Sequence, residues 1–304
     1  MPTHPEEILT YHALYTSPLV SVSDYCCRAC QREAAPEESS ERNNVVLLRH
    51  GLFARHFGKR HATTDVNQST FFTKDSTYRV SHPAGAGDRG TVFSVSPRVL
   101  NDMVRELDRS VDEHPERPFP FDTGPCEPTV FWRHREFVLR LEEASIRPME
   151  PLWADVTALQ LVADVLQAAF ARHGKTRRPQ RSATDADHLE RAEAAKIYLA
   201  SHLSERITLD DVARAVHASP FHLARVFQQR TGAPVHRYLT RLRLRASLER
   251  LMDGAADLTA LALELGFSSH SHFTDAFRRE FGCAPSEVRT RGRALRQMSK
   301  KLEV

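Results

Sequence analysis

Apolar residues in the last third of the chain recur every three or four positions, which is typical of helices with one buried face. Short polar stretches interrupt this recurrence, so the pattern predicts a helix, a turn and a second helix over Leu209–Gly232 and again over Leu258–Gly282. Equivalent positions lie 49 residues apart before the turn and 50 after it: Leu209, Val212, Ala213 and Val216 correspond to Leu258, Leu261, Ala262 and Leu265, and Ser219, Leu223, Phe227 and Gly232 correspond to Ser269, Phe273, Phe277 and Gly282. Because core packing does not require duplicated turns, the repeat favours two helix-turn-helix copies that read neighbouring stretches of DNA major groove; two helical hairpins without a ligand are the alternative.

Residues that begin helices stand at matching places in the two copies. Ser219 followed by Pro220 is typical of a helix N-cap with proline in the first turn, and Ser269 holds the same place in the second copy. Thr208, followed by Asp210 and Asp211, predicts a hydroxyl cap with acidic residues near the positive end of the helix. The second helices are therefore expected to begin at residues 220 and 270.

Between Asn44 and Pro97 the pattern changes to short runs rich in Val, Leu, Phe and Thr, separated by turn residues. The runs are VVLLRHG, LFARHFG, KRHATT, STFFTKD, TYRVSHP and TVFSV. Their density predicts a small β-sandwich or barrel. Helices are expected after these runs at 96–108, 129–144 and 152–171, with a proline-rich loop at 115–128.

The expected helix at 152–171 carries an apolar strip, formed by Leu152, Val156, Leu159, Val162, Ala163 and Leu166. Such a strip is typical of a dimer seam, and packing against the chain's own barrel is an equal alternative. The following segment, His173–His188, is polar, charged and interrupted by proline, which predicts a linker between domains.

Charge supports a division at this linker. From Leu189 onward the chain has 19 Lys and Arg against 13 Asp and Glu, a balance of +6, whereas the first 188 residues have a balance of −3. A basic half joined to a slightly acidic half fits one domain that binds nucleic acid and one that does not.

Length and composition limit the remaining choices. At 304 residues the chain is long enough for two domains. We count no apolar run near the ~20 residues that a membrane span needs, and the first residues lack the basic-then-apolar pattern of a signal peptide. Five irregularly spaced cysteines favour a reducing compartment. We therefore expect a cytoplasmic protein without a membrane partner.

The segment from about Leu189 to Arg291 closely resembles the DNA-binding domain of AraC-type transcription regulators. The most specific part is LALELGFSSHSHFTDAFRREFGCAPSEVR, from Leu261 to Arg289. The resemblance covers about a third of the chain and implies an all-α domain of seven helices, in which a long central helix, here about Val235–Met252, joins the two helix-turn-helix copies. It also implies that the third and sixth helices enter successive segments of the major groove.

The resemblance places base-reading side chains on the outward faces of these two helices, Pro220–Arg230 and His270–Glu280. The candidates for DNA contact are Phe221, His222, Ala224, Arg225, His270, Ser271, Thr274, Asp275, Arg278 and Arg279. Arg225 suits a guanine edge and Phe221 a thymine methyl group. Asp275 departs from the basic residue of some relatives and would either accept from a cytosine amino group or repel phosphates. Arg241, Arg243 and Arg245 join Arg278 and Arg279 as candidates for phosphate contact, and a solvated charged face is the alternative for each.

The order of strands, helices and paired helix-turn-helix copies is similar to regulators of the arabinose type, whose amino-terminal domain is a cupin-like barrel. This implies an α+β protein: a cupin-like domain for effector sensing and dimerisation at 1–172, a linker at 173–188, an AraC-type DNA-binding domain at 189–291 and a tail at 292–304. The resemblance further implies a homodimer that binds double-stranded promoter DNA, answers a small-molecule effector and contacts RNA polymerase as an activator; a repressor is the alternative.

One cluster in the first half suggests different chemistry. Cys26, Cys27 and Cys30 include a Cys-x-x-Cys pair, which is half of a zinc site and a spacing also found in oxidant-sensing thiols. Completion of a zinc site would need further ligands, for which the candidates are His50, His56, His61, His82 and Cys126. A regulator switched by zinc or thiol oxidation at this cluster is thus a competing hypothesis, and unreactive thiols are the third reading.

Enzymatic activity is not expected. Methyl-accepting repair proteins that contain an AraC-like module need four zinc cysteines in two pairs, and this chain has one pair. A metal-dependent cupin oxygenase would need a His-x-His motif among the strands, whereas that spacing occurs only at His270 and His272, in the expected recognition helix. A G-x-S-x-G motif is absent.

Overall fold

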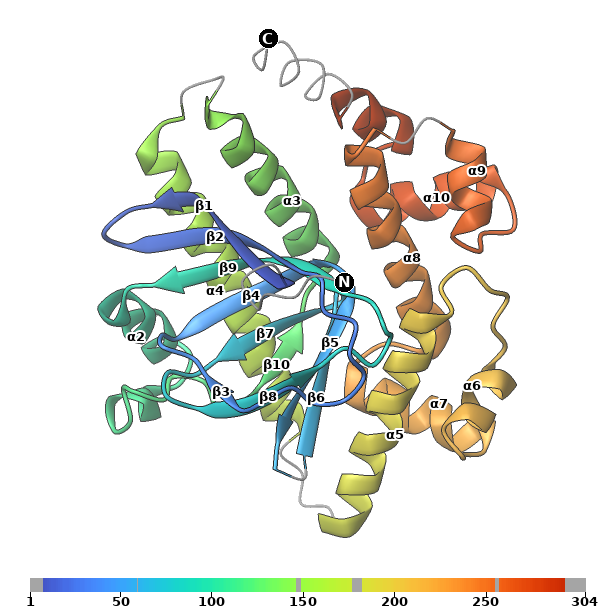
Figure 1. Ribbon diagram of the computed structural model, residues 1–304, viewed down its shortest axis with the longest axis horizontal. Coiled ribbons are helices and arrows are strands. Elements are labelled where there is room, and N and C mark those ends of the chain that lie inside the picture. The colour runs from blue at the N-terminus through green and yellow to red at the C-terminus, as the bar shows by residue number, and fades with distance from the viewer. Residues whose placement is uncertain (1–7, 59, 146–148, 177–181, 255–256, 293–304) are drawn as a thin grey trace. The chain divides into compact units, whose positions relative to one another are not determined.

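The structure is a computed structural model that describes residues 8–58, 60–145, 149–176, 182–254 and 257–292 (Figure 1). The chain divides into two compact units, Met1–Gln180 and Arg181–Val304. The amino-terminal unit combines antiparallel strands with helices, and the described part of the carboxyl-terminal unit consists of helices joined by turns. This architecture confirms the predicted α+β class.

Two antiparallel sheets form the amino-terminal unit. Its strands are β1 (Leu9–Thr16), β2 (Val20–Cys27), β3 (Glu38–Ser39), β4 (Asn44–His50), β5 (Leu52–Phe57), β6 (Arg60–Asp65), β7 (Gln68–Phe72), β8 (Thr77–Ser81), β9 (Asp88–Val95) and β10 (Thr123–Pro125). One sheet has the order β1-β2-β9-β4-β7-β10 and the other the order β3-β8-β5-β6. The six runs read as strands in the sequence correspond to β4 to β9, so those predictions are confirmed.

The buried run of β4 explains its central place in the first sheet. Val45 to Leu48 are all buried, which is expected of a strand covered on both faces. Arg55 of β5 connects the second sheet to the first: it donates to the carbonyl oxygen of Phe71 at 2.9 Å and to Thr70 Oγ1 at 2.7 Å on β7. Its guanidinium also lies 4.2 Å from the centroid of the Phe72 ring, so these contacts compensate in part for the burial of a residue that is 2% exposed.

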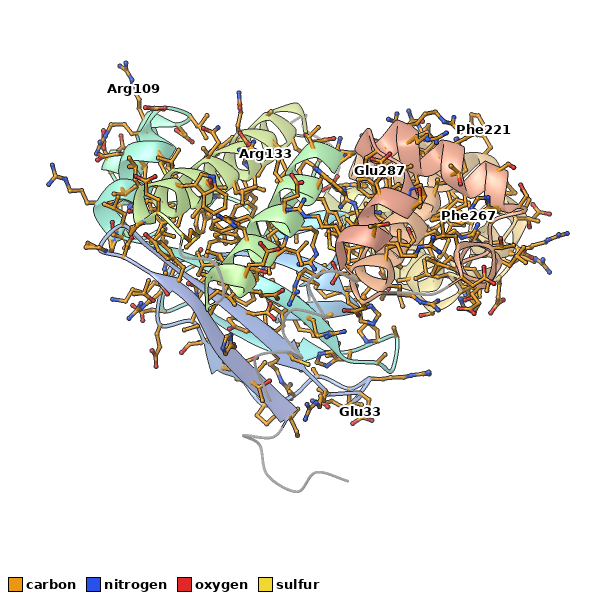
Figure 2. All side chains as sticks on the ribbon, turned by 90° about the horizontal axis from the view of Figure 1, so that it is seen from above. Glu33, Arg109, Arg133, Phe221, Phe267 and Glu287 are labelled. Atoms are coloured by element: carbon orange, nitrogen blue, oxygen red, sulfur yellow. The ribbon has the colours of Figure 1, made fainter. Side chains whose placement is uncertain are left out.

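Three helices follow the strands of the amino-terminal unit: α2 (Pro97–Arg105), α3 (Pro128–Glu142) and α4 (Pro151–Thr176). Short 3-10 turns lie at Arg109–Asp112 and Glu143–Ser145. Helices α3 and α4 cover one face of the six-stranded sheet, with α4 against β2, β9 and β10 (Figures 1 and 2).

Helix α4 revises the expectation that no apolar segment approaches the length of a membrane span. Its residues Pro151–Gly174 are long and apolar enough to cross a membrane by length and composition alone, a property concealed in the sequence by Asp155 and Asp164. One such helix is weak evidence for a span, because the core helix of a folded domain has the same composition. Here Leu161 and Val165 are buried in the amino-terminal unit.

The apolar strip predicted on α4 is buried at one end and exposed at the other. Val162 and Leu166 are buried inside the unit, whereas Leu152 is 66% exposed and Val156 57% exposed. The strip therefore contributes to the unit's own core at its carboxyl-terminal end and remains open to solvent at its amino-terminal end.

The described residues of the carboxyl-terminal unit form seven helical segments, the number that the resemblance implied. Six are α5 (Ser182–Ser201), α6 (Leu209–Ala215), α7 (Pro220–Thr231), α8 (Val235–Met252), α9 (Leu258–Glu264) and α10 (His270–Phe281), and the last spans 285–292. Helix α8 packs against both α7 and α10 and buries leucines such as Leu242, Leu248 and Leu251 between them. It is therefore the element that joins the two copies of the repeat.

The predicted linker, His173–His188, differs from the structure at both ends. Helix α4 continues to Thr176 and α5 begins at Ser182, while residues 177–181 lie outside the described residues. The reason is tertiary: His188 is 4% exposed, and Asp185 forms an ion pair with Arg230 of α7. Because these contacts come from α7, the local polarity of the segment did not reveal them.

Candidate nucleic-acid interface

The first copy of the repeat is fixed by the caps that the sequence predicted. Thr208 and Asp211 form a capping box: the Asp211 backbone N–H donates to Thr208 Oγ1 at 3.2 Å, and the Thr208 backbone N–H donates to Asp211 Oδ2 at 2.9 Å. The turn passes through His217, whose φ is +51°, and Ser219 Oγ accepts the His222 backbone N–H at 3.3 Å to begin α7.

The second copy repeats this geometry with different residues. Asp257 accepts the backbone N–H of Thr259 at 2.7 Å to begin α9. Gly266, at φ +75°, stands where His217 stands in the first copy, and Ser269 Oγ accepts the His272 backbone N–H at 3.1 Å to begin α10. The two recognition helices end in the same way, because both are followed by a left-handed glycine, Gly232 and Gly282.

Helix α7 presents its amino-terminal residues to solvent. Leu223, Val226 and Phe227 are buried, as their spacing predicted. Phe221 is 82% exposed, the largest value among the exposed large apolar side chains of the described residues (Figure 2). Arg225, one turn further along, is also exposed. The solvent-exposed side chains of Phe221 and Arg225 lie on one face of α7, and they suit contacts to a thymine methyl group and to a guanine edge.

Two of the other candidates on α7 are less accessible than expected. Ala224 is half-buried, and so is His222, whose ring lies 5.2 Å from the ring of His188 on α5. His222 therefore packs partly against the carboxyl-terminal unit itself. This contact was not predicted, because the polar composition around His188 indicates a linker rather than a packed helix.

Helix α10 has a similar division. Ser271, Asp275, Arg278 and Arg279 are exposed, while His270 and Thr274 are half-buried. Thr274 Oγ1 is covered and has no hydrogen-bond partner among the described residues. His272, which was not a candidate, is exposed, and its Nδ1 lies 3.0 Å from Ser268 Oγ.

Three arginines proposed as phosphate contacts have structural positions instead. Arg245 is fully buried, and Arg241 Nε lies 3.2 Å from Glu280 Oε1. Arg243 donates to the backbone carbonyls of Leu203 at 2.8 Å and of Gly266 at 3.0 Å, and burial lowers its pKa. These assignments are wrong because the pattern of α8 alone does not reveal which neighbouring carbonyl or carboxylate each guanidinium meets. Arg278 and Arg279 stay as predictions for phosphate contact.

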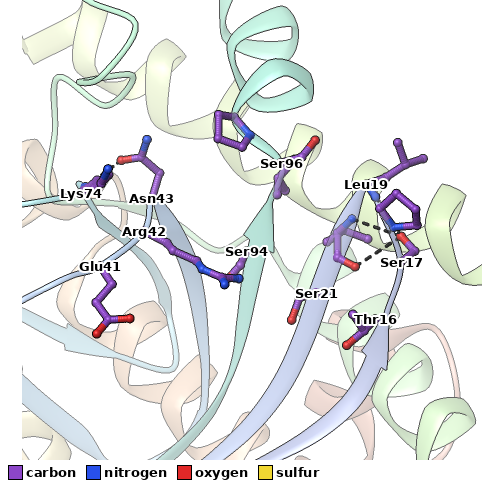
Figure 3. A pocket seen from close by; sticks show the side chains of 14 residues that line it. Thr16, Ser17, Leu19, Ser21, Glu41, Arg42, Asn43, Lys74, Ser94 and Ser96 are labelled. Atoms are coloured by element: carbon purple, nitrogen blue, oxygen red, sulfur yellow. Dashed lines mark hydrogen bonds between the residues drawn. The ribbon is translucent and has the colours of Figure 1, made fainter.

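The amino-terminal unit contains a surface hollow of about 400 Å³ (Figure 3). It is lined by the turn between β1 and β2, the residues before β4, and the end of β9. Arg42 and Lys74 supply positive charge there, Glu41 supplies one negative charge, and Ser21 and Ser94 supply hydroxyl groups. Ser17 at the rim is occupied by the turn itself, since its Oγ accepts the backbone N–H of Leu19 at 3.1 Å. The volume lies in the range of small-molecule pockets.

The predicted cysteine cluster is not one ligand set. Among the described residues, two groups have ligand atoms within 4.8 Å of one another; one contains Cys27 together with His82 and Asp88, and neither group includes Cys26 or Cys30. Cys26 Sγ is half-buried on the other side of the strand, and Cys30 is exposed. Burial disfavours the charged imidazole of His82, but the hydrogen bonds to Asp88 and Cys27 raise its pKa to about 9.

Comparison with known proteins locates a match in the carboxyl-terminal unit. Residues 212–291 match the model of a family described as a helix-turn-helix domain. The chain is 37% identical over 92 residues to the HTH-type transcriptional activator RhaS of Escherichia coli O139:H28 (strain E24377A / ETEC), and the match covers 30% of this chain and 33% of that protein. RhaS of Escherichia coli strain SE11 matches with the same values. The chain therefore spans about a third of the length of these curated relatives.

Two solved structures are also similar to parts of the chain. Apo ToxT from Vibrio cholerae strain SCE256 is 13% identical with a TM-score of 0.39, covering 89% of this chain and 97% of its own. A transcriptional regulator with an AraC-type DNA-binding domain from Chromobacterium violaceum is 27% identical with a TM-score of 0.32, covering 37% of this chain and 96% of its own. At such TM-scores neither superposition adds to the evidence from the sequence match.

Proposed function

We propose that this chain is a transcription regulator of the AraC family by its carboxyl-terminal unit, and that it binds promoter DNA sequence-specifically through α7 and α10. The observation that carries the proposal is the repeated site: both copies have a serine N-cap, a left-handed residue at the same place in the turn (His217 and Gly266) and a left-handed glycine at the end of the second helix. Each copy buries its second helix on one side and leaves the residues near the amino-terminal end of that helix accessible. Such helices read base edges in the major groove.

The roles of the side chains follow from their chemistry. Arg225 forms a bidentate contact to a guanine edge, and Phe221 packs on a thymine methyl group. Ser271 and Asp275 are the base-contacting residues of α10, and Arg278 and Arg279 bind phosphates. The exposure of all six side chains supports these roles, whereas His222, Ala224, His270 and Thr274 contribute at the edge of the contact.

We further propose that residues 1–172 form a domain that senses a small molecule and that residues 189–291 form a domain that binds DNA. The first turns of α5, which precede residue 189, also belong to the DNA-binding domain. The hollow beside Arg42 and Lys74 is the candidate effector site, and these two positive charges against the one negative charge of Glu41 favour a small anion. In this proposal the protein acts as a cytoplasmic homodimer that activates transcription by contact with RNA polymerase. The similarity to an activator over the helix-turn-helix domain supports activation rather than repression, and no catalytic step is part of the proposal.

The proposal is tested by selecting bound sites from random double-stranded DNA with the full-length protein, followed by footprinting. The expected result is a selected sequence with two conserved segments about one helical turn apart. Footprinting of Arg225→Ala should lose protection in one segment only. Arg105→Ala is the matched control, because it removes an exposed positive charge from the amino-terminal unit. Failure to enrich any sequence at low salt would refute sequence-specific binding.

The effector proposal has its own test. Thermal unfolding of the wild-type protein is measured with a panel of small anions and compared with the double variant Arg42→Ala/Lys74→Ala. An anion that raises the melting temperature of the wild type and leaves that of the variant unchanged supports the assignment. An equal rise of the melting temperature in both proteins would show that the anion binds outside this hollow.

A further inference from the structure

Strand register brings Cys27 and Asp88 together in the amino-terminal unit. The two residues are directly paired across the antiparallel strands β2 and β9. Side chains of directly paired residues lie on the same face of a sheet, with their Cβ atoms about 4.5–5.5 Å apart. His82, from the loop before β9, completes the group, and all three ligand atoms lie within 4.8 Å of one another.

The distances indicate that the three side chains converge on a single point. His82 Nε2 lies 2.8 Å from Asp88 Oδ2 and 3.5 Å from Cys27 Sγ. In a thiol–imidazole–carboxylate relay the thiol and the carboxylate contact opposite ring nitrogens. Here both contact the same nitrogen, whose single proton cannot point at both. This geometry favours a shared cation over a relay that activates the thiol.

We propose that Cys27, His82 and Asp88 form a binding site for one zinc ion or a similar borderline-soft divalent cation. A thiolate, an imidazole and a carboxylate are the protein ligands that zinc uses. With Zn–S of about 2.3 Å and Zn–N of about 2.0 Å, tetrahedral geometry separates sulfur and nitrogen by about 3.6 Å, close to the 3.5 Å between Cys27 Sγ and His82 Nε2. The Asp88 carboxylate must withdraw from Nε2 by about half an ångström to admit the ion.

The charge of the site suits a divalent cation. His82 is 2% exposed and Asp88 3% exposed, and Cys27 is half-buried. A bound Zn²⁺ would hold Cys27 as a thiolate and Asp88 as a carboxylate, and its two positive charges would replace the His82 proton that otherwise balances Asp88. Because only three protein ligands are present in this group, a fourth position is left for a water molecule or a ligand that enters from solvent.

Neighbouring residues hold the ligands in place. The Tyr25 hydroxyl donates to Asp88 Oδ1 at 2.6 Å, which leaves Oδ2 directed at the site. The Tyr25 ring lies over Gly90, its cross-strand partner, where an added Cβ would come within 2.7 Å of the ring. Gly87 approaches the Cys27 carbonyl oxygen so closely that a Cβ there would lie at 2.0 Å. Such outer contacts typically change metal affinity tenfold or more when they are removed.

The experiment titrates full-length, metal-free protein with Co²⁺ and records the sulfur-to-cobalt charge-transfer absorption, which reports a thiolate ligand. The wild type is expected to give this band with one equivalent of Co²⁺ and to lose it on addition of Zn²⁺. Cys27→Ser should abolish the band, and His82→Asn and Asp88→Asn should weaken binding at least about tenfold. Tyr25→Phe, which keeps the ring, should weaken binding about tenfold through the freed carboxylate.

Two kinds of control separate this site from other ligands. Cys26→Ser and Cys30→Ser should keep the band, because neither cysteine belongs to the group. His222→Ala removes a second group, Asp187, His188 and His222, and should also keep it. A band that survives Cys27→Ser, or that is lost equally in Cys26→Ser and Cys30→Ser, would overturn the proposal, as would the absence of any band in the wild type.

A measurement without variants guards against misfolding of the mutants. The wild-type protein is alkylated with and without Zn²⁺, and the rate at each cysteine is followed by peptide mass spectrometry. Zn²⁺ should slow the modification of Cys27 at least tenfold and leave that of Cys30 unchanged. Equal rates at Cys27 in both conditions would contradict a zinc site at this thiol.

Discussion

Arg225 and Arg279 are both exposed arginines on recognition helices, yet their truncation should have different consequences. Arg225 lies in the first half of α7, where side chains reach base edges, whereas Arg279 lies in the last turns of α10. We predict that Arg225→Ala costs about 1–3 kcal/mol on the selected site and relaxes preference at one base position. Arg279→Ala should weaken binding to all sequences alike. It should also reduce the slope of the logarithm of the binding constant against the logarithm of the salt concentration by about one.

The measurement is equilibrium binding of each variant to the selected site and to a scrambled duplex at several salt concentrations. Because both substitutions remove one positive charge, each variant serves as the charge-matched control for the other. Equal losses on both duplexes for both variants would remove the base-reading role from Arg225.

His134 is a residue whose environment predicts a dependence of stability on pH. It is fully buried, with its ring 5.9 Å from that of Phe93, and neither ring nitrogen has a hydrogen-bond partner among the described residues. Burial lowers its pKa well below 6.5, and the charges of Arg135 and Arg49 lower it further. The folded state therefore keeps His134 neutral under conditions in which the unfolded chain takes up a proton.

Because the unfolded state then binds more protons, stability is lost as the pH falls below about 6.5. We predict that His134→Leu reduces the fall in the melting temperature of the amino-terminal unit between pH 7.5 and pH 5. Differential scanning calorimetry of wild type and variant across this range tests the prediction. Parallel curves would show that His134 does not carry the acid sensitivity.

The sequence predicted individual residues well where only local periodicity decides. Leu223 and Phe227 were placed inward and Arg225 outward, as the structure has them. Arg243 was misplaced, because its carbonyl partners come from residues 203 and 266, far away along the chain. Asp88 was missed for a similar reason: only the register of β2 against β9 sets it beside Cys27.

At the scale of elements, the glycine that follows α10 allows a test of whether its left-handed conformation stabilises the carboxyl-terminal unit. Gly282 has φ +76°, and a Cβ added there would meet no atom within 4 Å. The cost of Gly282→Ala is therefore backbone strain alone, about 1–2 kcal/mol. Chemical denaturation of the carboxyl-terminal unit should show this loss, with Gly282→Asn losing less, since asparagine tolerates the left-handed conformation better.

Gly174→Ala is the matched control for this substitution. Gly174 lies in helix α4, where a Cβ also meets nothing within 4 Å, so the same change should stabilise its own unit by about 0.5–1 kcal/mol. If Gly282→Ala proved neutral, the left-handed stop of α10 would not be required.

Elements with strong periodicity or dense apolar runs were predicted, and those with weaker signals were not. The runs that became β4 to β9 stood out because they are short, rich in Val, Leu, Phe and Thr, and separated by turn residues. Strand β2 was missed because Asp24 interrupts its alternation, and strand β1 was missed although Leu9 to Ala13 alternate; none of the residues of β1 is buried. Their place at one edge of the six-stranded sheet explains how that composition is tolerated. The first turns of α5 were missed because the contacts of Asp185 and His188 come from α7, which lies far away along the chain.

At the scale of the carboxyl-terminal unit, helix α8 determines how the two copies act together. Its 18 residues span about 27 Å, and it packs against both recognition helices. Arg241 joins it to Glu280 in α10, and Arg243 joins it to the turn of the second copy at Gly266. Because these contacts are inside one compact unit, the two recognition helices are expected to meet DNA at a fixed separation.

This rigidity predicts how the operator responds to insertions between its two segments. Five added base pairs turn the second segment to the opposite face of the duplex, and ten restore the face but move it about 34 Å further away. A rigid unit reaches neither, so both insertions should reduce affinity to that of one segment alone. Binding assays with the three operators test this. Recovery of affinity at ten base pairs would mean that the copies move independently, and α8 would then be a tether rather than a spacer.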